Sequence, residues 1–142
     1  MFRKSVRVRD YMIRRPVLVQ TDTDIFEAIR QIINHRISGV TVVDEHRTPV
    51  GILSELDCLR AILSGSYYGE DQGLLKVEDY MTSPVESIHI DENIIDVAKS
   101  MLDHKRRRRP VVDENGHLIG QVTCRALLKA IRDMDIPDRK PA

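Results

Sequence analysis

The chain carries one stretch of sequence twice, and this internal repeat constrains its fold more than any other feature. Residues 8–12 (VRDYM) return as residues 77–81 (VEDYM), and the same offset relates VVDE at 42–45 to VVDE at 111–114. Identical residues recur in this register through most of both copies. A repeat of this length is a whole folding unit, so we expect two copies of one unit that pack as a pair.

Composition argues against several classes of protein. The 142 residues are 42% apolar and contain no Trp, so we expect a core built mainly of Ile, Val and Leu. The 22 basic and 22 acidic residues balance, which argues against general attraction to nucleic acid or to an anionic membrane. No stretch approaches the roughly 18 apolar residues of a membrane span, and the charged start is not a signal peptide. Cys58 and Cys124 have no CxxC spacing, so cytoplasmic residence is the default expectation.

Within each copy the hydrophobic period changes in the order β-α-β-β-α. In the first copy it predicts a strand at 16–19, a helix after the candidate caps Asp22 and Asp24, strands at 39–43 and 49–53, and a second helix closed by Ser64 and Gly65. In the second copy it predicts a strand at 88–90, a helix from Ile94, strands at 110–112 and 118–122 around the turn Asn115-Gly116, and a last helix. We therefore predict an α+β fold of two repeats, at 1–66 and 77–134, with a linker at 67–76 and a flexible tail at 135–142.

These segments resemble the CBS domain, the regulatory repeat named after cystathionine β-synthase. The resemblance rests on DYM at the start of each copy, on VVDE, and on residues 51–57 (GILSELD), which are similar to the family signature G-h-h-[S/T]-x-x-D, where h is apolar. It implies a stand-alone tandem pair, called a Bateman module, whose copies pack sheet to sheet with pseudo-two-fold symmetry. In the family, clefts between the copies bind adenine nucleotides or related adenosyl ligands, and modules often pair into flat dimers.

The signature residues also have a chemistry of their own. Ser54 is predicted to end a strand, and Asp57 to lie on the first turn of the next helix. A carboxylate there can accept two hydrogen bonds from a vicinal diol such as a ribose, and Ser54 with the free amides of the helix start can face a phosphate. The alternative is that both residues only cap the helix, which Ser and Asp do well.

The second copy departs from the signature. Thr123 keeps the hydroxyl, but Ala126 stands where the first copy has Asp57, and Arg125 adds positive charge. A cleft built on the second copy therefore lacks a ribose acceptor. We expect two unequal sites, with the better one built around Asp57.

Five consecutive basic residues, 105–109, lead into a strand of the second copy. The residues alone leave three interpretations open: a solvated loop, a polyphosphate site of guanidinium groups, or a nucleic-acid contact, which lacks interleaved aromatics. The resemblance favours phosphate, because basic residues here commonly line the phosphate end of the cleft in CBS pairs. It points to Arg107 and Arg108, with Arg125 in reach of the same cleft. The corresponding place in the first copy is occupied by Ser38, Gly39 and Val40.

The resemblance predicts a regulatory module and not an enzyme. It implies a sensor for an adenosine-containing ligand of the AMP, ADP or ATP class that signals to a regulated enzyme or transporter, with no required cofactor and no metal. A homodimer is expected too, because the apolar helix residues exceed what one internal interface needs. These residues are Leu56, Leu59, Ile62, Leu63, Leu127, Leu128, Ile131 and Met134. The alternatives are a structural dimerisation module with empty clefts, an S-adenosylmethionine or dinucleotide sensor, a small enzyme, and a nucleic-acid-binding protein.

Overall fold

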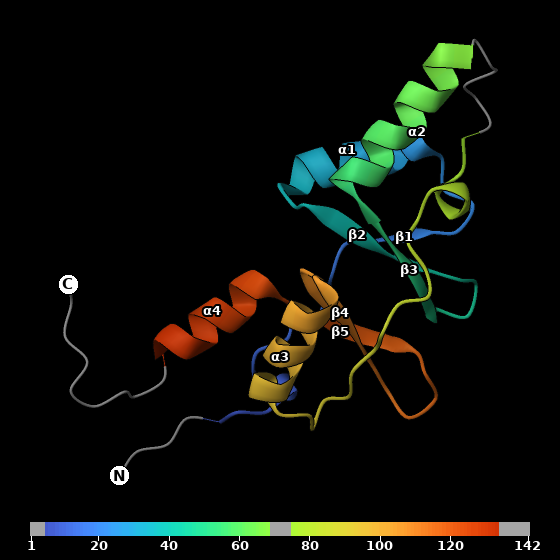
Figure 1. Ribbon diagram of the computed structural model, residues 1–142. Coiled ribbons are helices and arrows are strands. Elements are labelled where there is room, and N and C mark those ends of the chain that lie inside the picture. Colours follow the sequence, from blue (N-terminus) through green and yellow to red (C-terminus); the bar gives the residue numbers. More distant parts are fainter. Residues whose placement is uncertain (1–4, 69–74, 134–142) are drawn as a thin grey trace, which may run out of the picture.

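The computed structural model describes residues 5–68 and 75–133. The predicted tail at 135–142, Met134 and most of the predicted linker lie outside these residues. The elements follow in the order η1 (Val8–Asp10), β1 (Leu18–Gln20), α1 (Ile25–His35), β2 (Gly39–Val43), β3 (Pro49–Ser54), α2 (Glu55–Tyr68), η3 (Val77–Asp79), α3 (Ile94–His104), β4 (Arg108–Val112), β5 (Leu118–Thr123) and α4 (Cys124–Asp133). Two repeats, each with a short sheet and two helices, confirm the predicted α+β fold (Figure 1).

The first helix of each copy begins and ends at residues whose chemistry suits a helix terminus. The side chain of Asp24 caps α1 and that of Asn93 caps α3, each by accepting the backbone N–H two residues further on. Each helix ends before a residue in the left-handed conformation, Arg36 after α1 and Lys105 after α3. The basic segment of the second copy therefore begins at a turn and leads directly into β4.

The second helix of the first copy is longer than predicted. α2 runs to Tyr68, past Gly65, where we expected it to end. A single glycine inside a helix costs only about 1 kcal/mol relative to alanine, which packing along the rest of the helix can offset. Like the other helices that the structure describes, α2 does not combine the length and apolarity that a membrane crossing requires.

The sheets of the two copies differ in their first strand. In the first copy β2 lies between β1, which runs parallel to it, and the antiparallel β3. In the second copy β4 and β5 form an antiparallel pair, but the predicted strand at 88–90 is reduced to a single bridge between Ile88 and Val111. Pro110 explains the loss on one side of this bridge, because it has no N–H with which to extend the pairing toward Glu86.

The two sheets face each other, and the helices cover their outer sides. Figure 1 shows α1 and α2 on one side of the strands and α3 and α4 on the other. Between the sheets, the hydroxyl of Thr41 in β2 donates to the side-chain oxygen of Gln121 in β5 at 3.3 Å, and both residues are buried. This contact joins the copies as the predicted sheet-to-sheet pair requires.

The opening segment of each copy packs against the other copy. Val8 is fully buried in the core of the second copy, whereas Val77 is fully buried in the core of the first. Further along, Ile52 of β3 and Thr82 exchange two backbone hydrogen bonds of 3.0 and 2.8 Å. Each core is therefore completed by the other copy, and the exchange brings the segment after Tyr80 alongside β3, where Figure 1 shows it as a yellow-green coil.

Candidate functional site

A cavity of about 290 Å³ lies between the copies, at the end of β3. Four segments line it: the start of β2, the corner from β3 into α2, the exchanged segment 82–85, and the basic segment 105–108. The lining residues are Ser38, Gly39, Ile52, Ser54, Glu55, Leu56, Asp57, Thr82, Pro84, Val85, Lys105, Arg106, Arg107 and Arg108. The first copy thus contributes the acidic side chains and the second copy the basic ones, in a volume near the lower end of small-molecule sites.

Ser54 and Asp57 cap α2 reciprocally. The N–H of Asp57 donates to Oγ of Ser54 at 3.1 Å, and the N–H of Ser54 donates to Oδ2 of Asp57 at 2.9 Å. This arrangement is a capping box, in which a hydroxyl and a carboxylate satisfy two free amides at the start of a helix. Capping is therefore one role of both residues, and the remaining lone pairs of the carboxylate decide whether Asp57 can have a second.

The carboxylate of Asp57 is almost buried but retains capacity for a ligand. Its Oδ1 accepts from Nη2 of Arg60 at 3.1 Å, and the hydroxyl of Thr82 donates to Oδ2 at the long distance of 3.5 Å. Arg60 also donates to the carbonyl of Tyr80 at 2.8 Å and lies over its ring. Since a carboxylate offers about four acceptor positions, one stays open and the weak Thr82 bond marks a second. We did not expect Arg60 or Thr82 from the sequence, because Thr82 reaches Asp57 only through the exchange of segments.

The basic segment places its arginines in different surroundings. Arg108 is 6% exposed and donates from Nη2 to Oγ of Ser38 at 2.7 Å, which ties the second copy to the first. Burial lowers the pKa of the Arg108 guanidinium, yet arginine remains protonated at neutral pH. Arg107 is exposed, and its carbonyl accepts the N–H of Cys124 at the start of α4. The segment is therefore not one uniformly solvated loop.

The structure brings most of the predicted ligand residues together and leaves three apart. The residues that line the cavity are Ser38, Gly39, Ser54, Asp57, Arg107 and Arg108. Val40 is fully buried in the core of the first copy and is not among the lining residues. Thr123 caps α4 through the N–H of Ala126 at 3.1 Å, and Arg125 is exposed on the first turn of α4. These three residues therefore lie outside the lining of this cavity.

Gly39, the Cys58 thiol and the absence of an ion site among the described residues further define what the cavity can bind. A Cβ at Gly39 would lie 2.7 Å from the carbonyl oxygen of Leu53, so glycine is needed there for the pairing of β2 with β3. Burial and the charges of Asp57 and Glu55 raise the pKa of the Cys58 thiol to about 11. Among residues 5–64 and 75–133, no three His, Cys, Asp or Glu side chains gather as in an ion site. The cavity thus offers a ligand carboxylates, hydroxyls and guanidiniums.

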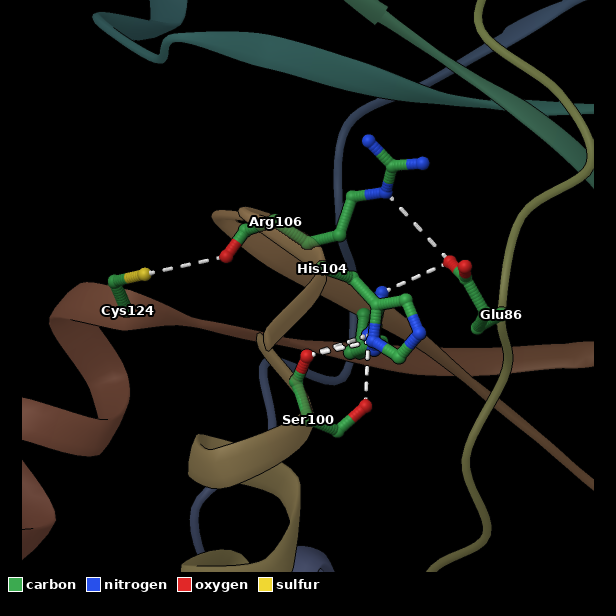
Figure 2. Close-up of polar contacts among 6 residues, drawn as sticks. Glu86, Ser100, His104, Arg106 and Cys124 are labelled. Carbon is green, nitrogen blue, oxygen red and sulfur yellow. Dashed lines mark hydrogen bonds and ion pairs between the residues drawn. The ribbon is translucent and has the colours of Figure 1, made fainter. Parts of the chain in front are cut away.

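Behind the basic segment lies a polar cluster that the sequence reasoning missed (Figure 2). Arg109 is fully buried, and its guanidinium binds Glu86 at 3.0 Å and the hydroxyl of Ser100 at 2.8 Å. Glu86 also lies 3.7 Å from Nε of Arg106, which lines the cavity. The repeat register contained a signal for this cluster, because Arg109 stands where the first copy has the buried Val40. A charge at a core position requires a counter-charge nearby.

The similarity of this chain to known proteins agrees with the architecture. The family model described as CBS domain matches it twice, at residues 8–64 and 77–133. An uncharacterized protein of Methanopyrus kandleri, MK0525, is 32% identical over 127 residues, which are 89% of this chain. The match spans 63% of the length of that relative.

Solved structures of CBS pairs have the same fold. CBSX2 in complex with AMP superimposes with a TM-score of 0.77 at 29% identity, over 90% of this chain and 97% of that one. The CBS domain pair of protein MJ0100, in complex with 5′-methylthioadenosine and S-adenosyl-L-methionine, gives a TM-score of 0.75 at 28% identity, over 89% and 95% of the two chains. Since the family model matches both copies and the fold is that of these pairs, the chain belongs to the CBS domain family, as a tandem pair of such domains.

Proposed function

We propose that this CBS pair binds an adenosine-containing nucleotide of the AMP, ADP or ATP class in the cavity between its copies. One observation carries the proposal: Asp57 of the first copy and the basic segment 105–108 of the second line the same cavity. A ligand with a diol and an anionic group matches these two kinds of side chain. The complexes of CBSX2 with AMP and of MJ0100 with two adenosyl compounds support an adenosine moiety.

Each part of such a nucleotide has a partner in the cavity. The ribose hydroxyls bind Asp57, one at its open acceptor position and one in place of the weak bond from Thr82. The phosphates bind Arg107 and Arg108, with the hydroxyl of Ser54 as a further donor. The base lies against apolar lining side chains such as Ile52 and those of 84–85.

The charge of the cavity favours a phosphate ligand over S-adenosylmethionine. Lys105, Arg106, Arg107 and Arg108 all line it, against the two carboxylates of Glu55 and Asp57. The sulfonium and amino groups of S-adenosylmethionine are positive and would meet like charge, which costs binding energy. A dinucleotide carries phosphates as well and remains the rival within this ligand class.

In this proposal the module regulates another protein and performs no catalysis itself. A nucleotide that bridges the copies stabilises one packing of the two repeats, and a regulated enzyme or transporter recognises that packing. Cys58 and Cys124 are both free, which agrees with a reducing compartment, and we place the protein in the cytoplasm. The corner at Thr123 and Ala126 has no carboxylate, so the site around Asp57 is the stronger of two unequal sites.

Pairing with a second copy of the chain is also part of the proposal. Large apolar side chains are exposed on the helices of both repeats: Ile33, Leu56, Leu59, Leu63, Leu102, Leu128 and Ile131. Of the residues expected to need a cover, Leu127 is buried in its own core and Ile62 is partly buried. A two-fold pair buries the exposed set of both repeats at once. Light scattering at micromolar concentration tests this, and a mass of one chain with and without nucleotide would contradict it.

A calorimetric titration series tests the nucleotide proposal. We expect AMP, ADP and ATP to bind more tightly than adenosine, and 2′,3′-dideoxy analogues to bind more weakly than their parents because Asp57 loses its diol. A ligand at 100 times its Kd should raise the free energy of unfolding by about 2.7 kcal/mol, which thermal unfolding detects. If adenosine, AMP, ADP and ATP all fail to bind, the module has empty clefts and a structural role. An affinity for single-stranded DNA equal to that for ATP, and falling steeply with salt, would favour the nucleic-acid alternative.

A further inference from the structure

Glu86 touches two arginines that differ in their role. One is Arg109, which is fully buried and does not line the cavity; the other is Arg106, which lines it. The same carboxylate oxygen, Oε2, lies 3.0 Å from Nη1 of Arg109 and 3.7 Å from Nε of Arg106 (Figure 2). Glu86 therefore connects the core of the second copy with the basic side of the cavity.

The contact with Arg109 fixes the position of Glu86. The buried guanidinium has Glu86, the carbonyl and hydroxyl of Ser100 and the ring of His104 as partners, while its Nε has none among the described residues. A buried charge cannot lose its carboxylate partner without a large cost. Partial burial disfavours the charged carboxylate, but its own backbone N–H and the charges of Arg109, Arg106 and His104 outweigh this and hold the pKa of Glu86 below its usual value.

The contact with Arg106 is of the opposite kind. It is long, at 3.7 Å, and the side chain of Arg106 is 34% exposed, so the guanidinium can leave Glu86 at small cost. Since Arg109 holds Glu86 in place, the movable partner in the cluster is Arg106. A phosphate in the cavity and the Glu86 carboxylate are thus two anions that compete for one guanidinium.

We propose that Glu86 is a specificity-determining residue that limits how strongly the cavity binds polyphosphate, because it occupies Arg106 and cancels one positive charge of the basic segment. This deepens the proposed function and rests on it for the nucleotide part of the ligand. A monophosphate is held by Arg107 and Arg108 and is little affected by Glu86. A di- or triphosphate extends to Arg106 and meets there a guanidinium whose charge Glu86 partly cancels.

The variants for a test have to separate this role from the support of Arg109. Glu86→Gln removes the charge but leaves Arg109 buried without a counter-ion, so it can fail to fold. Arg109→Met removes the buried charge in a side chain of similar length, and Val40 shows that the equivalent position of the first copy accepts an apolar residue. The comparison is therefore between Arg109→Met and the double variant Glu86→Gln/Arg109→Met, with wild type and Glu86→Gln as a second pair.

The control variant removes a carboxylate of the same kind elsewhere. Asp91 pairs with Arg9 and Arg7 and does not line the cavity, so Asp91→Asn breaks an acid–arginine cluster without touching the basic segment. The probes are adenosine, AMP, ATP and inorganic tripolyphosphate, titrated by calorimetry at fixed ionic strength. Tripolyphosphate reads the basic segment without any nucleoside.

We expect the double variant to bind ATP and tripolyphosphate about tenfold more tightly than Arg109→Met, which is the order of effect of one unit charge at roughly 10 Å in a partly buried site. Adenosine should be unchanged, and AMP should gain about threefold or less. The inference is overturned if tripolyphosphate gains no more than adenosine, if Asp91→Asn gives the same gain, or if no variant binds tripolyphosphate. Tripolyphosphate binding that depends on Glu86, with no binding of adenosine or AMP, would support this inference while the nucleotide proposal fails.

Discussion

The two copies place opposite charges on one backbone frame. At the corner from strand to helix, the first copy has Ser54 and Asp57, which form a complete capping box. The second copy has Thr123 and Ala126, which keep only the hydroxyl half of it at 3.1 Å. The negative charge of the corner is therefore present once.

At the start of β2 in the first copy and of β4 in the second, the distribution of charge is reversed. The first copy has the uncharged Gly39 and Val40 there, and the second has Arg108 and Arg109. The backbone hydrogen bonding still repeats. In each copy the first N–H of the second helix, α2 or α4, donates to the carbonyl directly before β2 or β4, at 3.0 and 2.9 Å respectively. Since the same backbone accepts charged or uncharged residues at these positions, the repeat does not need these charges in order to fold. The acid of one copy and the bases of the other meet in the lining of the shared cavity.

Among the features in which the copies differ, the buried charge of Arg109 in the second copy should have the largest effect on stability when its partner is mutated. Glu86→Gln leaves Arg109 without its counter-charge, so we expect the free energy of unfolding to fall by about 2–3 kcal/mol. The cost is below that of a fully buried pair because Glu86 is 43% exposed and Arg109 keeps its bonds to Ser100. Urea unfolding followed by circular dichroism measures the change.

Two controls accompany this measurement. Glu86→Gln in the Arg109→Met background should cost much less, because no buried guanidinium then loses its carboxylate partner. Asp91→Asn, in an exposed pair with Arg9, should leave stability unchanged within error. If Glu86→Gln is as stable as wild type, the buried charge of Arg109 does not need the carboxylate of Glu86, and the difference from Val40 does not affect stability through that carboxylate.

The corner of the first copy should decide binding. Asp57→Asn keeps an oxygen that can accept the N–H of Ser54, but it removes the charge that strengthens hydrogen bonds to a ribose. We expect the affinity for AMP to fall about 10- to 100-fold, which corresponds to about 1.5–3 kcal/mol, with a smaller loss of stability. Asp44→Asn is the matched control, because Asp44 caps a hairpin turn away from the cavity. Equal affinities of wild type and Asp57→Asn in calorimetry would remove Asp57 from the site.

The exposed arginine of the basic segment should have a smaller effect that depends on the ligand. Arg107→Ala should weaken ATP about fivefold, the equivalent of about 1 kcal/mol for an exposed ion pair, and spare adenosine. Arg108→Ala should act in the same direction more strongly, but it also breaks the bond to Ser38. Arg132, exposed on α4 outside the cavity, is the control position. Equal losses for adenosine and ATP would mean that Arg107 does not bind phosphate.

The repeat made much of this fold predictable, because local chemistry acts in the same way in both copies. The caps of the helices, the buried strand β2 and the corner at Ser54 and Asp57 follow from patterns within a few residues. The predicted strand at 88–90 is reduced to a bridge at Ile88, and Pro110 explains only the missing pairing toward Glu86. The predicted end of α2 was wrong because Gly65 alone does not stop a helix.

The parts of the site that the sequence did not predict come from contacts between distant segments. No local pattern indicates that the opening segment of one copy packs on the other, so Thr82 beside Asp57 was not foreseen. The partners of Arg109 were hidden for the same reason, since Glu86 lies in a stretch without regular structure. Comparison of the copies position by position would have shown the buried arginine, though not its counter-ion.

The smallest expected effect comes from a substitution at Ala126, which tests whether a carboxylate at the corner from β5 into α4 is enough to create a nucleotide site. Ala126→Asp completes the capping box of α4, since the carboxylate can accept the N–H of Thr123, and should stabilise the fold by about 0.5–1 kcal/mol. Ala126→Asn, without the charge, should give less. We expect binding at this second corner to stay far weaker than at Asp57, because the segment of the first copy equivalent to 105–108 is Arg36-Ile37-Ser38-Gly39, with one basic residue. If calorimetry finds an additional bound nucleotide per chain in Ala126→Asp, a carboxylate at the corner suffices for binding, and the basic segment is not what separates the two copies.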